Sequence, residues 1–370
     1  MKRTCLFAVA LTALAVACQK NGPAPSPGKD RGVSLTIGIR GADLPSPLSK
    51  AEAVTGSEEE NTVTGIQVFV FKKNGNDYLF ETSAKASGSS ATLTVTSGTK
   101  SIIVLANEDT DFTLSGEAVL DRSALYAQFC TLKAHRTGHF RMMGEKVGVT
   151  VGNTSATATC TVPVSRLVSR VEIKKITNSL QYGYAGEDVS VVRAFLTGVP
   201  EKVNFGVDPN HPDVAGMLHY DSFYATTGIN TRLDLNGEAV QEEEKTAVNA
   251  LIYKSVNSEV LAEGASYSQP VVLYTCPNDL AHRATHVVVE LRIGGKYYTY
   301  PVELPRLEPN CTYQINELVI KSIGNPGNGD DQLDGEEDLP ITHVDCTFSV
   351  EVQPWTLTVL SNGDDGKWTI

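Results

Sequence analysis

Residues 33–39, Val-Ser-Leu-Thr-Ile-Gly-Ile, place an apolar side chain at every second position. Successive side chains of a β-strand point to opposite faces, so this period of two predicts a strand with one buried face. Val33, Leu35, Ile37 and Ile39 would form that face. Because segments of this kind recur along the chain, we expect an all-β protein.

Further strand candidates are separated by residues that are typical of turns. Residues 66–71 and 78–82 flank Lys73-Asn74-Gly75-Asn76, which predicts a β-hairpin. We expect a second hairpin around Ser97-Gly98, between strands at 91–96 and 101–106. Other strand candidates lie at 167–176, 189–196, 271–275, 286–293, 297–302 and 312–320. The only helical spacing of note covers 121–133, and the irregular stretch 200–265 predicts long loops.

Two alternating runs come near the end of the chain, after an acidic, Gly-rich linker at 325–338. The apolar phase slips by one residue at Pro354, which predicts a bulge or a break between two strands. The architecture that we expect is two β-sandwich-like domains in series, at residues 33–160 and 161–370, with an alternating strand at each end of the chain. The apolar positions of the terminal runs are Phe348, Val350, Val352, Trp355, Leu357 and Val359.

The first residues have the layout of an export signal. Lys2 and Arg3 precede an apolar run from Leu6 to Val16, and Cys18 follows Ala17. This pattern predicts a signal peptide at 1–17 and a lipidated Cys18, which would hold the protein on a membrane by acyl chains. The alternative is an ordinary signal peptide with an incidental cysteine. Residues 18–32, rich in Pro, Gly and Ser, predict a flexible tether.

Composition and motifs exclude several classes of function. The net charge is -12 and the pI is ≈ 5.1, which argues against binding of a nucleic-acid backbone. The chain contains no GxSxG, Walker loop, HExxH or GxGxxG motif. We therefore expect no enzyme, no catalytic residue, no cofactor and no metal site.

Cysteines and histidines offer weaker signals. The five cysteines beyond Cys18 contain no CxxC spacing, so they are expected to be small buried residues, with one or two disulfides left open. Cys130 lies near His135 and His139, but a core cysteine with surface histidines is favoured over a zinc site or a nucleophile. His282 and His286 repeat the four-residue spacing without a helical context, and the acidic run 330–338 lacks calcium-loop spacing. The five cysteines are Cys130, Cys160, Cys276, Cys311 and Cys346.

The strand at 33–39 is removable in principle. A polar, Pro-containing segment, 40–60, joins it to the rest, and Arg40 and Lys50 offer cleavage points to an Arg- or Lys-specific protease. Removal would leave an apolar groove and a row of unpaired backbone groups, which is a template for strand addition. The C-terminal runs of another subunit would refill that groove. The alternative is that both terminal strands complete their own sheets.

Several blocks of the sequence resemble fimbrillins of the FimA/Mfa type, the type V pilins of Bacteroidales. The likeness covers most of the chain after residue 50, through the order and spacing of the blocks together. It implies two transthyretin-like β-sandwich domains, export as a lipoprotein, proteolytic removal of the N-terminal segment, and strand exchange into adhesive fimbriae. The blocks are GSEEENTVTGIQVFVF (56–71), TVTSGTKSIIVLAN (94–107), VPVSRLVSRVEI (162–173), VVLYTCPN (271–278) and LEPNCTYQINELVIKSIG (307–324).

The resemblance also assigns roles to residues. The processing site falls on Lys50-Ala51, where the family typically has Arg followed by Ala, and Arg40-Gly41 is the other candidate. Residues 33–50 would be removed, and 346–370 would form the terminal donor region. The partners implied are other fimbrial subunits, the outer membrane before processing, and a surface protease.

The leading hypothesis is therefore a polymerising fimbrial subunit, first an outer-membrane lipoprotein and then part of a surface fimbrium. Two rivals stay open. One is an accessory subunit at the anchor or the tip, and the other is a non-polymerising surface lipoprotein that binds glycans.

Overall fold

The computed structural model of the chain consists mainly of β-strands, which confirms the all-β prediction. No helix of the described part is long and apolar enough to cross a membrane. The structure describes residues 32–41, 54–113, 122–153, 155–206, 219–220, 247–248, 250–278, 284–327, 346–347, 349–356, 361–362 and 368–369.

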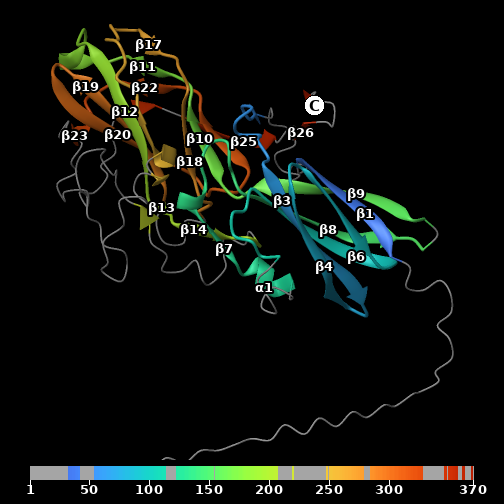
Figure 1. Ribbon diagram of the computed structural model, residues 1–370. Helices are drawn as coiled ribbons and strands as arrows, with labels where there is room; N and C mark the ends of the chain where they lie inside the picture. The colour runs from blue at the N-terminus through green and yellow to red at the C-terminus, as the bar shows by residue number, and fades with distance from the viewer. Residues whose placement is uncertain are drawn as a thin grey trace, which may run out of the picture.

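A seven-stranded sheet occupies one end of the molecule (Figure 1). Its two outermost strands, β4 and β5, contact each other, so the sheet curls into two layers. One layer contains β3, β4, β6 and β8, and the other contains β1, β5 and β9. In order across the sheet, the strands are β4 (Asp77–Ser87), β3 (Gly65–Asn74), β6 (Gly98–Ala106), β8 (Met142–Val151), β9 (Thr157–Arg166), β1 (Val33–Gly41) and β5 (Ser90–Val95).

Local sequence explains two features of this sheet. The β3–β4 hairpin turns at Gly75, whose φ of 64° lies in the left-handed region that glycine adopts without strain. Gly144 on β8 lets that strand approach β9, because a Cβ at this position would lie 1.8 Å from the carbonyl oxygen of Pro163. The first hairpin predicted from the sequence is therefore confirmed.

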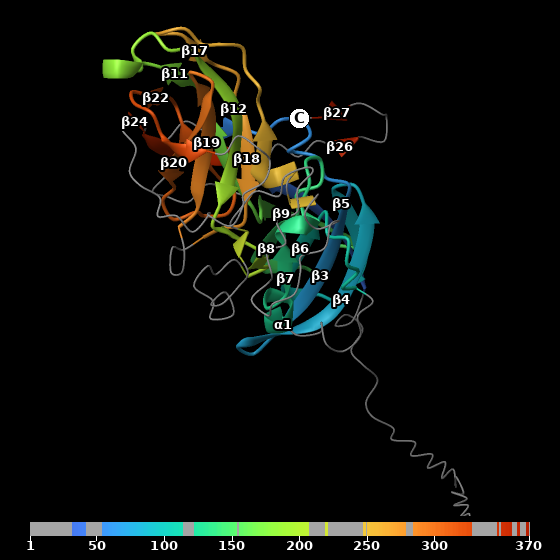
Figure 2. The same cartoon turned by 90° about the vertical axis from the view of Figure 1, so that its left-hand side faces the viewer.

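Later residues, together with Val54 and Thr55, form three further sheets at the other end of the molecule (Figure 2). The first, in order, contains β18 (Val271–Thr275), β10 (Ser169–Ile173), β21 (Cys311–Ile315), β25 (Val350–Thr356) and β2 (Val54–Thr55). The second contains β17 (Ser266–Tyr267), β11 (Ile176–Asn178), β22 (Leu318–Ile320) and β24 (Cys346–Thr347). The third contains β16 (Tyr253–Ser255), β12 (Val189–Thr197), β19 (His286–Ile293), β20 (Lys296–Glu303) and β23 (Asn325–Gly327).

Three strand pairs lie outside these sheets. They are β13 (Val199–Pro200) with β15 (His219–Tyr220), β14 (Lys202–Asn204) with β7 (Phe129–Thr131), and β26 (Ser361–Asn362) with β27 (Trp368–Thr369).

The two ends of the molecule share one hydrophobic core. A continuous cluster of buried side chains runs from Val33 on β1 to Ile320 on β22. Strand β9 continues across residues 160 and 161 and lies in the seven-stranded sheet up to Arg166. A division of the chain by sheets therefore falls just after Arg166.

The second predicted hairpin is wrong in its pairing. Strands do form at Ser90–Val95 and Gly98–Ala106, but β5 pairs with β1, whereas β6 pairs with β3 and β8. The turn between them carries the chain from one layer of the sheet to the other. Local alternation could not distinguish this crossing from a hairpin, because both need the same two strands.

The prediction of a helix over 121–133 is mostly wrong. The helix α1 covers only Arg122–Tyr126, and the chain then forms β7 and a 3-10 turn at Leu132–Ala134. Strand β7 pairs with β14, which lies far away in the sequence, and this pairing overrides the weak helical spacing.

The predicted break at Pro354 is also wrong, because β25 runs through it and pairs with β21 from Val350 to Pro354. Strand β2 pairs only with Trp355 and Thr356. The missing N–H of Pro354 therefore interrupts no ladder on the β2 side.

Candidate functional site

Strand β1 lies in the interior of the seven-stranded sheet, between β9 and β5. It runs parallel to β9, with Ile37 beside Cys160, and antiparallel to β5, with Ile37 opposite Ala91. Residues near the N-terminus thus bridge two strands from later parts of the chain. Without β1, both neighbours would lose their backbone partners on that side.

The side chains of β1 divide sharply between its two faces. Val33, Leu35, Ile37 and Ile39 are at most 9% exposed, as the period of two predicts. On the opposite face the Thr36 hydroxyl lies 3.0 Å from the Thr92 hydroxyl of β5. The strand is therefore amphipathic, and its inner side fills an apolar groove. Buried residues of β5 and β9 that flank this side are Ala91, Leu93, Val95, Cys160, Val162 and Val164.

The candidate cleavage residues fall in two places. Arg40 and Gly41 are the last residues of β1, where they pair with Pro163 and Val164 of β9. The Arg40 side chain is exposed, and its Nη1 donates to the Gly41 carbonyl at 3.0 Å. Lys50, Ala51 and the lipidation candidate Cys18 lie outside the described residues.

Some of the predicted donor residues lie in the described part of the chain and others do not. Val350, Val352 and Trp355 lie on β25, between β21 and β2 in a sheet that does not contain β1. The Val350 side chain is half-buried and packs against the core. Phe348, Leu357 and Val359 lie outside the described residues. In this structure β1 and β25, the described strand of the predicted donor residues, thus lie in two different sheets of the same molecule.

A buried polar junction, which the sequence analysis missed, begins directly after β2. Ser57 and Glu60 have the spacing of a capping box: the Ser57 amide donates to Glu60 Oε2 at 2.6 Å, and the Glu60 amide donates to Ser57 Oγ at 3.2 Å. The S-x-x-E motif was the available signal. What it could not indicate was the burial of Glu60, which is only 4% exposed.

Glu60 joins the turn to the second half of the protein. Its Oε1 accepts hydrogen bonds from Arg170 Nε at 3.0 Å and from the Tyr274 hydroxyl at 2.6 Å. Arg170 also donates to Glu172 Oε2 at 3.0 Å. Burial by itself raises the pKa of Glu60, but these donors and the Ser57 amide more than offset it, so the pKa lies below the ordinary value.

Arg166, at the end of β9, completes the junction from the other side. Its side chain is fully buried and donates to the Glu60 carbonyl at 3.2 Å, to Asn61 Oδ1 at 2.5 Å and to Asn310 Oδ1 at 3.2 Å. Burial lowers the pKa of Arg166 to about 9, so it remains charged at neutral pH. Two arginines and two glutamates therefore balance their charges where the two halves meet.

The histidines beside Cys130 are buried, which corrects the prediction of surface histidines. His135 is 1% exposed and His139 is 9% exposed. His135 Nε2 lies 3.0 Å from Cys130 Sγ, while its Nδ1 accepts the Arg141 amide at 3.2 Å. Burial raises the pKa of Cys130 and lowers that of His135 to about 3, so the pair is neutral and poorly suited to nucleophilic chemistry. Among the described residues, no group of three His, Cys, Asp or Glu side chains could hold a metal ion.

The described cysteines Cys130, Cys160, Cys276 and Cys311 are buried free thiols, as small core residues would be. Cys346 lies on β24, but its side chain is outside the described part.

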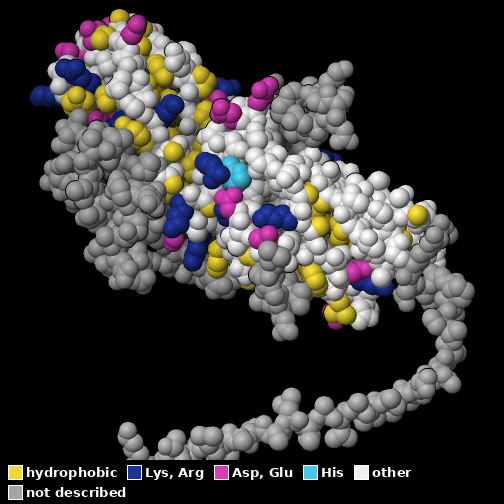
Figure 3. All heavy atoms as spheres, viewed as in Figure 1, with side chains coloured by type: hydrophobic (Ala, Val, Ile, Leu, Met, Phe, Trp, Pro, Cys, Tyr) yellow, Lys and Arg dark blue, Asp and Glu magenta, His cyan; other side chains and the backbone are white. Residues whose placement is uncertain are grey.

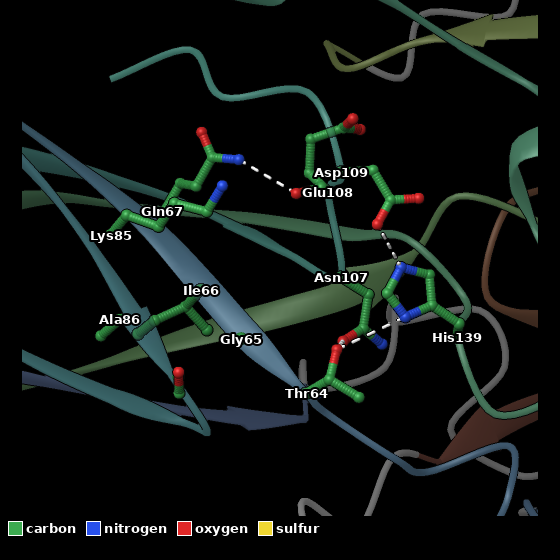
Figure 4. Close-up of a pocket in the computed structure, with 11 residues that line it drawn as sticks. Thr64, Gly65, Ile66, Gln67, Lys85, Ala86, Asn107, Glu108, Asp109 and His139 are labelled. Atoms are coloured by element: carbon green, nitrogen blue, oxygen red, sulfur yellow. Dashed lines mark hydrogen bonds and ion pairs between the residues drawn. The ribbon is translucent and has the colours of Figure 1, made fainter. Parts of the chain in front are cut away.

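A shallow pocket of about 420 Å³ opens beside β3 and β4 (Figure 4). His139 lies between Asp109 Oδ1, at 3.1 Å from Nε2, and the Thr64 hydroxyl, at 3.4 Å from Nδ1. Gln67 donates to the carbonyls of Glu108 and Thr110. These hydrogen bonds connect the loop after β6 to β3 and to His139.

The face in Figure 3 carries side chains of both charges across its centre, with apolar side chains in small separate groups. On this face the described surface shows no extended basic patch and no broad apolar patch.

Comparisons with known proteins agree with the fold. Residues 34–184 match the sequence model of the major fimbrial subunit protein (FimA) family. No curated protein matches the chain.

Two solved structures are similar over most of the chain. A candidate cell adhesion protein from Bacteroides eggerthii DSM 20697 has 18% identity and a TM-score of 0.57, and the match covers 90% of this chain and 98% of that one. Another, from Parabacteroides distasonis ATCC 8503, has 14% identity and a TM-score of 0.58, with 88% and 98% covered. At these identities the structures show a shared fold.

The family match spans β1 and the whole seven-stranded sheet and continues into β10 and β11 of the second half. The resemblance to fimbrillins of the FimA/Mfa type is therefore confirmed for residues 34–184, which match the sequence model of the FimA major fimbrial subunit family.

Proposed function

We propose that this chain is a structural subunit of a cell-surface fimbria that is exported as a lipoprotein, cut by a protease and polymerised by donor strands. The observation that carries the proposal is the position of β1, an N-terminal strand inside the sheet whose four inner side chains are buried. The family match supports a fimbrial or adhesive role in general.

Loss of β1 would remove a large part of the free energy that stabilises this sheet, and binding of a replacement strand could restore it. A large apolar side chain contributes about 1.5–3 kcal/mol when fully buried, so four of them amount to on the order of 10 kcal/mol. Whole domains are stable by only about 5–15 kcal/mol. The open groove would therefore be a high-affinity site for a strand with the same apolar spacing, and a second copy of the chain carries such a strand.

The C-terminal sequence suggests the register of that strand. Residues 346–352, Cys-Thr-Phe-Ser-Val-Glu-Val, match 33–39 position for position in their apolar residues. Ser349 would take the place of Thr36 and keep a hydroxyl near Thr92. Glu351 would take the place of Gly38, where a Cβ meets nothing within 4 Å. The second run, from Trp355, offers only three alternating apolar residues.

The position of Arg40 favours Lys50-Ala51 as the processing site. A protease binds its substrate as an extended chain that is free of other partners, whereas Arg40 and Gly41 are paired with β9 inside the sheet. Cutting after Lys50 would release β1 together with any lipid on Cys18.

We further propose that the two halves, divided near Arg166, act as two sandwich domains in series.

One experiment tests processing and assembly together. The protein without residues 1–17 is treated with an Arg/Lys-specific protease and run unboiled on a denaturing gel, and its new N-terminus is sequenced. We expect a ladder of multimers that begins at Ala51. Lys50→Ala should abolish the ladder, and the matched control Arg40→Ala should keep it. A single intact monomer would contradict the proposal and favour an anchor subunit or a glycan-binding lipoprotein.

A disulfide trap tests the register. In the proposed register, Val350 takes the place of Ile37 beside Cys160. Neighbouring strands lie about 4.8 Å apart, within the range for a disulfide. Val350→Cys should therefore give cross-linked dimers after cleavage and none before it. Val350→Cys with Cys160→Ala is the control, and cross-linking by Leu357→Cys instead would place the second run in the groove.

A further inference from the structure

We propose that residues 54–61, the latch, stay on the protein after processing and hold β25 in its own sheet. The latch consists of β2 and the turn that contains Ser57, Glu60 and Asn61. Its importance for assembly rests on the proposed function, but its effect on β25 can be measured in a single uncut molecule.

Strand β25 lies near the place where the two groups of strands meet (Figure 1). It pairs with β21 on one side and with β2 on the other, where Val54 and Thr55 run parallel to Trp355 and Thr356. Strand β2 is the outermost strand of this sheet, and it covers the free edge of β25 at Trp355 and Thr356. An uncovered strand edge invites pairing with other chains.

The turn after β2 is stiffened by its own hydrogen bonds. Asn61 Nδ2 donates to the Gly56 carbonyl at 2.9 Å, and the Asn61 amide donates to the Ser57 carbonyl at 3.0 Å. Together with the two bonds between Ser57 and Glu60, these contacts fix the exit of the chain from β2. Motion of β2 away from β25 must therefore bend or break this turn.

Glu60 then fixes the turn to the sheet that contains β25. Its partners Arg170 and Tyr274 lie on β10 and β18 of that same sheet. Arg166 holds the Glu60 carbonyl and Asn61 from the seven-stranded sheet. The latch is thus attached to both halves through buried charged groups, and none of these attachments involves β1.

The two strands on either side of the proposed cut are therefore held independently. Before processing, residues 42–53 connect β1 to β2. A cut after Lys50 would leave only Ala51, Glu52 and Ala53 ahead of β2. Strand β1 could then leave without displacing the latch, and β25 would stay docked until β2 separates from it. This order would open the groove before it frees the donor, which limits premature pairing between copies.

Hydrogen exchange on the uncut protein, without residues 1–17, tests the latch. Glu60→Gln should accelerate amide exchange in residues 350–356 by about tenfold, because local opening of that segment becomes easier. The matched control is Glu145→Gln, which removes a half-buried carboxylate of β8 that is bonded to Arg122 and Tyr126 of α1. It should leave exchange in 350–356 unchanged.

Equal acceleration by both variants, or no change in 350–356 with Glu60→Gln, would overturn the proposal. Should Glu60→Gln fail to fold, Tyr274→Phe removes a single hydrogen bond from Glu60 and should give a smaller acceleration in the same segment. A disulfide between Val54→Cys and Trp355→Cys should suppress the effect.

Exchange is measured before any cleavage, so its outcome is separate from that of the gel ladder. A latch effect without a ladder would reject polymerisation alone, and a ladder without a latch effect would reject the latch alone.

Discussion

Strand β1 and the latch are neighbours in the sequence, yet the rest of the protein holds them in different ways. Strand β1 is held by apolar side chains and backbone ladders, and its polar face makes one hydroxyl contact with Thr92. The latch is held by Glu60, Asn61 and the arginines that face them. Any strand with the right apolar period could replace β1, whereas the latch needs particular charges at particular places. This difference agrees with the proposal that β1 is replaced during assembly and that the latch stays in place.

The largest effect should come from a charge on the inner face of β1. Ile37→Asp places a carboxylate in a fully buried apolar position, and we expect a loss of about 5 kcal/mol in the free energy of unfolding. Urea denaturation measures it. The control Thr92→Asp, at an exposed position on β5, should cost less than about 1 kcal/mol. Similar losses in both variants would contradict the apolar account of β1.

Removal of the charge on Glu60 should have the next largest effect. Glu60→Gln leaves Arg166 and Arg170 buried with one carboxylate fewer, and we expect a loss of about 3 kcal/mol. Glu317→Gln, on a partly exposed ion pair with Lys175, should lose less than about 1 kcal/mol. Equal losses would mean that the junction is no stronger than a surface pair.

Acidification should remove the stabilisation that the ionised Glu60 carboxylate provides. Its pKa is lower in the folded protein than the ordinary value of 4.5, so its stabilisation is full above pH 4.5 and is lost as the pH falls through the folded pKa. The difference between wild type and Glu60→Gln should therefore shrink below pH 4.5. A difference that stays constant on acidification would contradict this assignment.

Titration of His135 should change the free energy of unfolding at a higher pH than titration of Glu60. Its pKa is 6.5 when unperturbed and about 3 in the folded protein, mainly because of burial and then the Arg141 charge. The unfolded chain binds the proton first, so stability is full above pH 6.5 and falls by up to about 1.4 kcal/mol per pH unit below it. His135→Gln should flatten the slope between pH 6.5 and 4.5, and an unchanged slope would place the titration elsewhere.

The smallest effect should come from the outer face of β1. Thr36→Val removes the hydroxyl contact with Thr92 and keeps a β-branched side chain, so we expect a change within about 1 kcal/mol. Thermal unfolding provides the measurement. A loss as large as that of Ile37→Asp would show that the strand is also held by its polar face, and the comparison with the latch would fail.

Elements whose signal is local could be predicted from the amino-acid sequence. The alternation of Val33, Leu35, Ile37 and Ile39 predicted both the strand and its buried face, and Asn74-Gly75 predicted the first hairpin. These features follow from the period of side chains along a strand and from the freedom of glycine at positive φ. The serine-to-glutamate spacing at Ser57 and Glu60 was equally visible, and it corresponds to a real capping box.

Which segments pair with one another depends on the folded arrangement of the whole chain. It paired β5 with β1 instead of β6, ran β25 through Pro354, and buried His135 and Glu60. Each of these outcomes depends on residues far away in the sequence, such as Tyr274, which lies 214 positions after Glu60. A buried charge is stable only when other groups pair with it, and for Glu60 two of these groups, Arg170 and Tyr274, come from distant segments that no local pattern specifies.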